Sequence, residues 1–215
     1  MAARGITKDA IIDAALAIGD AAGLEAVSMR AVASRLGIQA MSLYHHLANK
    51  ADLLDALHER LITEMNLPDG AGTDWRDILR GVAAAYRAVA LAHPRLFVLL
   101  TTRPISTPAS FAHISPALRV LDAEGIAPDV QFFAIEVFFT SLNGYLLAEV
   151  GPVPGHPDLL NPAMPTIGED APAMLRLLRE LDEAGRGDHY FADTFDAYVE
   201  VLIGGLAPLV DGAQS

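Results

Sequence analysis

The sequence predicts an all-α fold, with a three-helix helix-turn-helix region at its start and a larger helical domain after it, about nine or ten helices in all. Two observations predict this class. Apolar residues recur at helical spacing along most of the 215 residues, and no segment shows strand-like alternation of useful length. The hydrophobic content of 52% provides enough apolar side chains for a sizeable core.

The first 50 residues predict three short helices. Thr7 can cap the first helix, which ends at Gly23. Ser28 can cap the second helix, and Gly37 can adopt the left-handed conformation that ends it. The third helix is expected to begin near Gln39. Together these signals indicate a helix-turn-helix unit of the size of a DNA-binding domain.

The third helix has two different faces. Leu43 and Leu47 lie four residues apart and are expected to face the core. The opposite face carries small, hydroxyl-bearing, aromatic and imidazole side chains, which suit a DNA groove: Ala40, Met41, Ser42, Tyr44, His45 and His46. An ordinary helical hairpin is the alternative for any single helix-glycine-helix pattern.

A connector helix and a helical domain follow. Asn49 can cap the connector, expected over residues 49–66, with Asp52 in an Asp version of the capping box. The turn at residues 68–70 is the expected boundary between a domain of residues 1–50 and one of residues 67–215. The next helix should stop at His93-Pro94, because the residue before proline disfavours helical geometry. Further helices are expected over residues 95–101, 110–124, 129–149, 172–184 and 189–210, with an irregular segment over 151–172.

Composition excludes several functional classes. The chain has no cysteine, so disulfides, thiolate metal sites and cysteine nucleophiles are excluded. The motifs HExxH and GxSxG are absent, and we predict no enzyme activity, no metal site and no cofactor. The N-terminus lacks a signal-peptide core, and we expect no apolar run of the roughly 20 residues that a membrane span needs. A cytoplasmic protein without a membrane partner is therefore expected.

Charge is distributed unevenly along the chain. The formal net charge is −12, but the excess of acidic residues lies after residue 50. The first 50 residues carry nearly balanced charge and contain both lysines of the chain, Lys8 and Lys50. DNA affinity depends on local neutralisation of phosphates, so this distribution is compatible with a DNA partner. An acidic enzyme would have a similar total charge.

Several short motifs resemble the TetR family of one-component bacterial regulators, and specifically its tetracycline repressor branch. In the first part of the chain the resemblance lies in Ile11–Leu16, Leu36–Ile38, Leu43-Tyr44, Asn49-Lys50 and Leu53–Leu57. In the second part it lies in Trp75–Leu79, Thr102–Pro104, Phe133–Ile135 and Gly205-Leu206. The resemblance therefore covers most of the chain. It implies an all-α regulator that binds double-stranded DNA.

The resemblance also implies individual DNA contacts. Positions that face bases in the family are Arg30, Ala40, Met41 and His45. Positions that contact the DNA backbone are Ser28, Ser42, Tyr44, His46 and Lys50. The arginine fork can hold a guanine edge with two hydrogen bonds, whereas backbone contacts fix the register. The alternative for Arg30 is a solvated surface side chain.

The tetracycline site of the branch is not retained. By resemblance, its metal-binding histidine becomes Leu99, and two polar drug contacts become Val82 and Ala117. Magnesium prefers oxygen ligands, so an apolar or aromatic effector is expected in place of a metal chelate. The candidate ligand-binding residues are Asn66, Val82, Tyr86, Leu99, Leu100, Thr102, Arg103, Ala117, Leu118, Phe132, Ile135 and Asn143. The alternative is that the apolar members only fill the core.

The family is dimeric, and two helices of this chain are candidates for the interface. The helices expected at about 129–149 and 189–210 are apolar on faces that a monomer would expose to water. A homodimer would present two recognition helices to a palindromic operator. An effector would release the dimer from that operator. A helical scaffold or partner-binding protein without effector response is the alternative class, with an enzyme as the weaker one.

Overall fold

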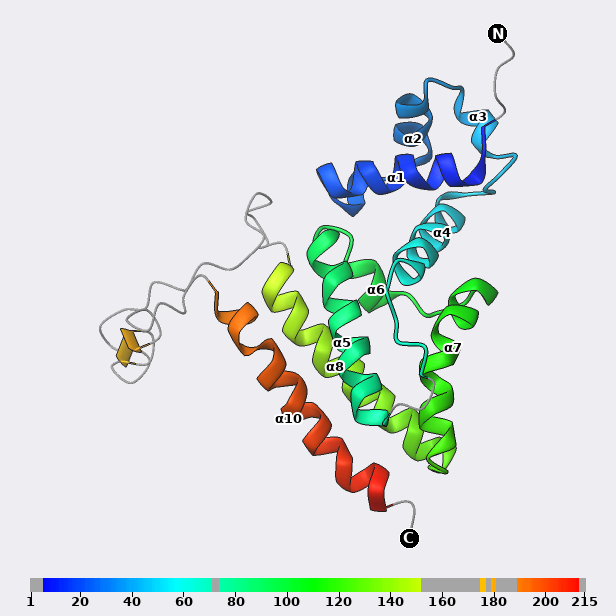
Figure 1. The fold of residues 1–215 in the computed structure, drawn as a ribbon. Coiled ribbons are helices and arrows are strands. Elements are labelled where there is room, and N and C mark those ends of the chain that lie inside the picture. Colours follow the sequence, from blue (N-terminus) through cyan, green and yellow to red (C-terminus); the bar gives the residue numbers. More distant parts are fainter. Residues whose placement is uncertain (1–5, 71–73, 152–174, 177–178, 181–188, 213–215) are drawn as a thin grey trace. The chain divides into compact units, whose positions relative to one another are not determined.

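The computed structural model describes residues 6–70, 74–151, 175–176, 179–180 and 189–212. These residues form α-helices, one short 3-10 helix and connecting turns, which confirms the all-α class (Figure 1). The chain forms two compact units, Met1–Leu121 and Asp122–Ser215, which are described separately below.

The first two α-helices begin where the sequence predicts. Helix α1 spans Lys8–Ala22, and the hydroxyl of Thr7 accepts from the Ala10 amide at 3.2 Å. After the 3-10 helix Leu24–Ala26, helix α2 spans Met29–Leu36. The Ser28 hydroxyl accepts from the Ala31 amide at 3.2 Å, and Gly37 ends the helix with φ 68°. A φ in this region is readily available only to glycine, so these boundaries follow from local chemistry.

Helix α3 is shorter than predicted. It covers only Ala40–Leu43, and hydrogen-bonded turns continue to Leu47. Its N-cap residue, Gln39, makes no capping hydrogen bond with its side chain. Short helices without such support are marginal because helix nucleation is costly. The predicted inward residues are nevertheless both buried, Leu43 fully and Leu47 almost fully.

Helix α4 spans Lys50–Thr63 and has the predicted cap. The side chain of Asn49 accepts from the Asp52 amide at 3.0 Å. The carboxylate of Asp52 accepts from the Ala48 amide, one residue earlier than in the usual capping box. The core shared by these helices is apolar and consists of Ile11, Ala15, Val27, Val32, Leu43, Leu53, Leu57 and Leu61.

Three further helices complete the first unit. Helix α5 spans Trp75–Ala92 and stops before His93-Pro94, as predicted. Helix α6 spans Val98–Thr102, later than the predicted residues 95–101, because the chain forms turns immediately after Pro94. Helix α7 spans Pro108–Ala123. Buried Trp75, Ile78, Leu96 and Phe97 form the apolar core around these helices.

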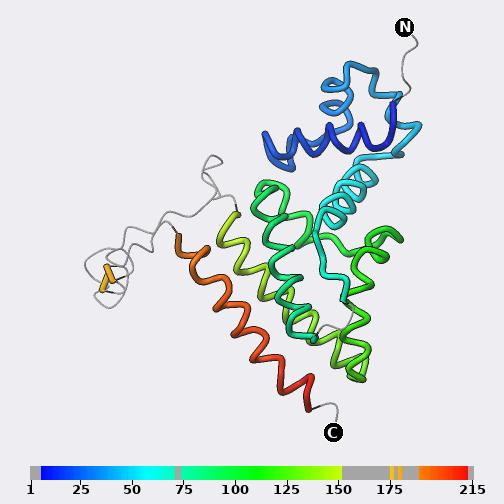
Figure 2. Tube along the Cα trace, in the orientation of Figure 1, coloured from blue at the N-terminus to red at the C-terminus, as the bar shows by residue number. Residues whose placement is uncertain are grey.

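The second unit consists, among the residues described, mainly of two long helices. Helix α8 spans Pro128–Val150 and helix α10 spans Tyr190–Gly212. They run antiparallel along each other (Figure 2). The buried side chains of these two helices include Phe138, Leu142, Leu146, Phe195, Val199 and Ile203. The predicted irregular segment and most of the predicted helix at 172–184 lie outside the described residues.

Helix α8 corrects one expectation from the sequence. By length and composition it could cross a membrane, whereas we expected no apolar run of that size. Only 22% of its most apolar 18-residue window is buried in the single chain. Core helices of soluble proteins can have the same length and composition, so this property alone does not indicate a membrane span.

Candidate functional site

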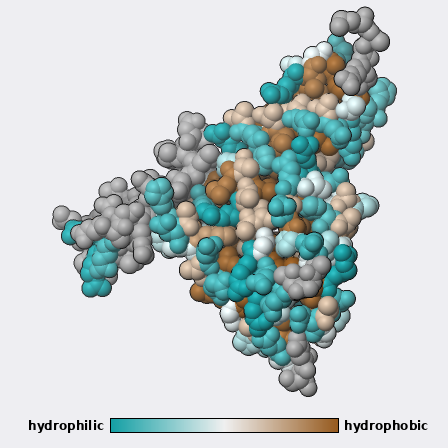
Figure 3. Space-filling model, in the orientation of Figure 1, coloured by the Kyte–Doolittle hydropathy of each residue, from teal (hydrophilic) through white to brown (hydrophobic). Residues whose placement is uncertain are grey.

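The predicted base-facing residues lie at the surface of α2 and α3. Arg30 and His45 are exposed, and Ala40 is half-buried at the first turn of α3. Met41 exposes 73% of its surface, although its side chain is apolar. Its exposure leaves the side chain accessible to a base, as the resemblance implies. Hydrophobic residues also reach the surface elsewhere, among hydrophilic ones (Figure 3).

The predicted DNA-backbone contacts lie on the same segment. Tyr44, His46 and Lys50 are exposed, whereas Ser28 and Ser42 are half-buried. The Ser28 hydroxyl accepts a hydrogen bond as the cap of α2. A contact with a phosphate oxygen, which is an acceptor, would use the proton of this hydroxyl.

Lys50 is the first residue of α4, and this position suits an anion. The amides at a helix N-terminus carry partial positive charge, and an ammonium group beside them adds to the local potential. The Asn49 side chain accepts from one amide of the first turn, that of Asp52. A phosphate here would therefore meet both backbone donors and a cation.

The candidate ligand residues of the first unit fall into two groups. Val82, Tyr86, Leu99 and Ala117 are buried. The ring of Tyr86 packs edge-on against Phe97, with centroids 5.4 Å apart, and burial raises the pKa of the Tyr86 hydroxyl. The remaining candidates reach solvent to different degrees: Leu100 is half-buried, whereas Asn66 and Leu118 are exposed.

Two polar candidates have protein partners. The Thr102 hydroxyl donates to the Val98 carbonyl at 2.7 Å. The Arg103 guanidinium forms an ion pair with Asp55 of α4, and its Nε donates to that carboxylate at 3.0 Å. It also donates to the Ala51 carbonyl. Arg103 therefore connects the end of α6 to α4, in addition to its predicted role as an effector ligand.

A buried histidine lies beside this ion pair, and the sequence did not single it out. His58 of α4 is only 3% exposed. Burial, and secondly the positive charge of Arg103, lower the pKa of His58, while the Asp55 carboxylate acts in the opposite direction. The neutral ring is thus favoured at this contact.

The candidate ligand residues of the second unit all lie on α8. Phe132 is 70% exposed, and Ile135 and Asn143 are half-buried. Within the described parts of the chain, no three histidine, aspartate or glutamate side chains are placed to hold a metal ion.

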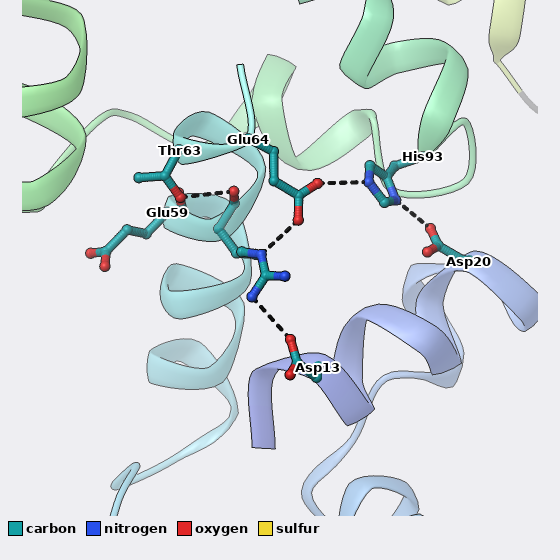
Figure 4. A network of polar contacts seen from close by, with 7 residues as sticks. Asp13, Asp20, Glu59, Thr63, Glu64 and His93 are labelled. Atoms are coloured by element: carbon teal, nitrogen blue, oxygen red, sulfur yellow. Dashed lines mark hydrogen bonds and ion pairs between the residues drawn. The ribbon is translucent and has the colours of Figure 1, made fainter. Parts of the chain in front are cut away.

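A polar network at the ends of α1, α4 and α5 was also not predicted (Figure 4). His93 Nδ1 lies 2.9 Å from Asp20 Oδ1, and His93 Nε2 lies 2.9 Å from Glu64 Oε2. Arg60 bridges Glu64 and Asp13 at 2.6 and 2.9 Å. The position of His93 before Pro94 is the only local signal. Its partners are 73 and 29 residues away, so no spacing rule could identify them.

Comparison with known proteins identifies the family. Residues 11–57 match the family model "Bacterial regulatory proteins, tetR family", and residues 67–207 match "Tetracyclin repressor-like, C-terminal domain". The chain belongs to the TetR family. This confirms the resemblance, which was based on motifs in both parts of the sequence.

Individual relatives agree with this assignment. The class G tetracycline repressor protein of Vibrio anguillarum is 30% identical over 186 residues, covering 84% of this chain and 86% of the relative. The chain spans about half the length of two other curated relatives that it matches, from Saccharopolyspora erythraea and Streptomyces coeruleorubidus. Apo ActR from Streptomyces coelicolor has the same fold, with a TM-score of 0.76 at 24% identity, covering 99% of this chain and 100% of ActR.

A further solved relative binds a small molecule. A single-residue variant of TetR from Acinetobacter baumannii AYE, in complex with minocycline, is 26% identical, with a TM-score of 0.59 and 96% coverage of both chains. TetR-family proteins are helix-turn-helix transcriptional regulators with a ligand-binding C-terminal domain, and they are not enzymes. Since such regulators act on DNA, membership in the family implies an intracellular location.

Proposed function

We propose that this chain is a cytoplasmic repressor that binds a palindromic operator as a homodimer and is released by an apolar or aromatic small molecule. Residues 1–50 bind DNA in this proposal, and residues 67–215 bind the effector and form the dimer. The exposed side chains of α2 and α3 support the DNA-binding role most directly. Arg30, Met41 and Tyr44 all reach solvent from one short segment of the helix-turn-helix.

The proposed DNA contacts are of two kinds: contacts with bases, which recognise the sequence, and contacts with phosphates, which position the protein. Arg30, with five N–H donors, can hold guanine bidentately, and such a contact contributes about 1–3 kcal/mol of discrimination. Ala40, Met41 and His45 are proposed to face the remaining bases. Ser28, Ser42, Tyr44, His46 and Lys50 are proposed to contact phosphates.

The exposed faces of α8 and α10 support a homodimer. Both helices expose large apolar side chains although they already pack against each other: Phe132, Phe133, Leu147, Val201 and Leu209. At the helical glycines Gly144, Gly204 and Gly205, an added Cβ would meet no atom within 4 Å apart from the chain neighbours and the backbone of its own helix, so the helix surface there is open in the single chain. A second copy would cover these surfaces in a four-helix bundle, at about 25 cal/mol per Å² of apolar surface removed from water.

The character of the candidate effector site supports an apolar ligand. Val82, Leu99 and Ala117 are buried and stand where the resemblance places polar or metal-binding groups of the tetracycline repressor. The other proposed ligand residues are Asn66, Tyr86, Leu100, Thr102, Arg103, Leu118, Phe132, Ile135 and Asn143. An effector that contacts Arg103 would compete with its ion pair to Asp55, and so act on α4.

A gel-shift experiment tests the DNA-binding role. The probe is the DNA flanking the protein's own gene, at low salt, with the dimer confirmed by light scattering. We expect the wild type and Arg35→Ala to shift the probe, and Arg30→Ala to fail at the same concentration. Arg35 is a matched control because it is an exposed arginine in the last turn of the same helix. A folded dimer that shifts no probe would contradict the proposal and favour a helical scaffold.

The effector is tested by release of that DNA. Apolar aromatic compounds and the tetracycline-magnesium complex are added to the preformed complex, and the free probe is measured. We expect release by members of the apolar set and no requirement for magnesium. Release by tetracycline-magnesium alone would contradict the proposed ligand class.

A further inference from the structure

His93 lies between two carboxylates that come from different helices. His93 directly follows the last residue of α5, and its side chain is 12% exposed. Asp20 belongs to the last turns of α1, and Glu64 directly follows α4. Figure 4 shows the imidazole pointing to Asp20 on one side and to Glu64 on the other. One ring thus connects two helices of the DNA-binding part to the start of the ligand-binding part.

Each ring nitrogen of His93 faces a hydrogen-bond acceptor. An ionised carboxylate only accepts hydrogen bonds, and a neutral imidazole has one donor and one acceptor nitrogen. Both ring nitrogens lie 2.9 Å from a carboxylate oxygen. Only the doubly protonated ring can donate to both, and charge-assisted bonds of this kind are stronger than neutral ones.

The residues after His93 hold the same end of α1. Arg95 Nη1 donates to the carbonyls of Asp20 and Ala21, at 3.1 and 3.3 Å. A cation at this position also complements the negative end of the helix dipole. Leu96, which is fully buried, packs so closely on Gly19 that a Cβ at residue 19 would overlap its side chain. Polar and apolar contacts therefore fix the end of α1 to the α5–α6 connection.

The network extends along α4 back to α1. The Glu64 carboxylate accepts from His93 with one oxygen and from Arg60 with the other. Arg60 in turn reaches Asp13, which precedes Asp20 on α1 by about two turns. We call the set Asp13, Asp20, Arg60, Glu64 and His93 the polar joint. Arg60 and His93 each contact two of its three acids, so removal of either side chain removes the contact that joins two carboxylates.

We propose that His93 is a positioning residue for operator binding, which acts by holding the ends of α1 and α4 on the α5–α6 connection through Asp20 and Glu64. The inference rests on the proposed operator-binding function. His93 does not contact DNA in this scheme. Its role is to restrict the orientations of the helix-turn-helix relative to the α5–α6 connection.

The restriction matters because operator binding needs two helix-turn-helix units at a defined separation. A unit that is held loosely samples more orientations, and only some of them fit the operator. The apparent dissociation constant rises in proportion as the competent fraction falls. Loss of the polar joint should therefore weaken operator binding without any change in the residues that contact DNA.

The test compares variants at position 93 in the full-length dimer. Operator affinity is measured by fluorescence anisotropy, and folding by circular dichroism and the thermal midpoint. His93→Gln can donate to only one carboxylate in the same geometry, and we expect about tenfold weaker operator binding, equivalent to about 1.4 kcal/mol. His93→Arg supplies several N–H donors for the two carboxylates, and we expect its affinity to lie within about twofold of the wild type.

Variants of the partners separate positioning from general destabilisation. Glu64→Gln should weaken operator binding at least as much as His93→Gln, because it also weakens the contact with Arg60. The double variant should lose less than the sum of the two single losses, because both variants break the same contact between His93 and Glu64. Asp77→Asn is the matched control. It breaks the surface ion pair to Arg80 on α5, away from the polar joint, and should leave affinity unchanged.

The outcomes distinguish failure of the proposed function from failure of the positioning role of His93. If the wild-type dimer binds no operator, the proposed function fails. If the wild type binds and His93→Gln binds equally or more tightly, the positioning role is overturned. Equal weakening by His93→Gln and His93→Arg, with both folded, would also overturn it, since the charged bridge would not be the cause. Should His93→Gln unfold, Glu64→Gln decides by the same criterion.

Discussion

The outward face of α2 and α3 and the polar joint use the same residue types in opposite ways. On the outward face, Arg30 and His45 are exposed. In the polar joint, Arg60 and His93 each bridge two acids from distant parts of the sequence. The residue type therefore does not define the role, and the local partners do. Side chains that meet solvent are available for DNA, and side chains that meet carboxylates hold helices together.

The largest effect is expected on the outward face. Tyr44→Ala removes an exposed aromatic ring that is proposed to contact the DNA backbone, and we expect operator binding to fall below detection in a gel shift that detects the wild type. The thermal midpoint should hardly change, because the side chain is 46% exposed. Tyr44→Phe, which loses only the hydroxyl, should retain part of the affinity. A large fall in the midpoint of Tyr44→Ala would contradict the distinction between the two regions.

The next effect is expected at the contact of α1 with Leu96. Gly19→Val would force two branches into the space of a fully buried leucine, and overpacking of this kind typically costs about 1–3 kcal/mol. Chemical denaturation measures the loss of unfolding free energy. Gly23→Ala is a useful comparison, because residue 23 has open space but a φ of 83°. Unchanged stability of Gly19→Val would mean that the joint can relax around the new side chain.

A smaller effect is expected for Lys50→Ala, on the salt dependence of operator binding. Lys50→Ala should weaken operator binding similarly for all sequences. It should also reduce the magnitude of the slope of log K against log salt by about 1.8, which is about 0.9 for each of the two Lys50 side chains of the dimer. Anisotropy titrations at several salt concentrations measure this slope. An unchanged slope would show that the N-terminus of α4 does not neutralise a phosphate through this lysine.

The smallest effect is expected for His58→Leu, on the pH dependence of the unfolding free energy. Burial lowers the pKa of His58 in the folded protein, so the unfolded chain binds more protons as the pH falls. Its contribution to stability is present above the ordinary imidazole pKa of about 6.5 and is lost as the pH falls below it. Denaturation between about pH 7.5 and pH 5 should therefore show a shallower loss for His58→Leu than for the wild type. An identical slope would indicate that other groups dominate.

Local chemistry explains which parts of the fold the sequence could predict. Thr7, Ser28 and Asn49 cap helices through hydrogen bonds to residues three positions on, and Pro94 ends α5 through contacts with its neighbour. Such signals span a few residues and can be found in the sequence. The shortness of α3 was missed because its leucine spacing continues to Leu47, while the backbone changes to turns.

The DNA-facing residues could be predicted from the sequence, whereas two histidines with tertiary partners could not. The family resemblance supplied the DNA-facing positions, and these remain predictions about contacts. The histidines at 58 and 93 were missed because their environment comes from tertiary structure. A buried ring beside Arg103, or a ring between Asp20 and Glu64, depends on contacts between residues far apart in the sequence. Neither periodicity nor spacing contains that information.

The close fit of α1 on the α5–α6 connection has a consequence for building hybrid sensors. Grafting residues 1–50 onto a foreign effector domain would carry over Gly19 and Asp20 but leave behind His93, Arg95 and Leu96. The recipient would need side chains that donate hydrogen bonds to Asp20 and to the last carbonyls of α1, and an apolar side chain that packs on Gly19. A hybrid that also receives residues 93–96 keeps the contact between the end of α1 and the α5–α6 connection. It is therefore a better starting point for a regulator that responds to a new effector.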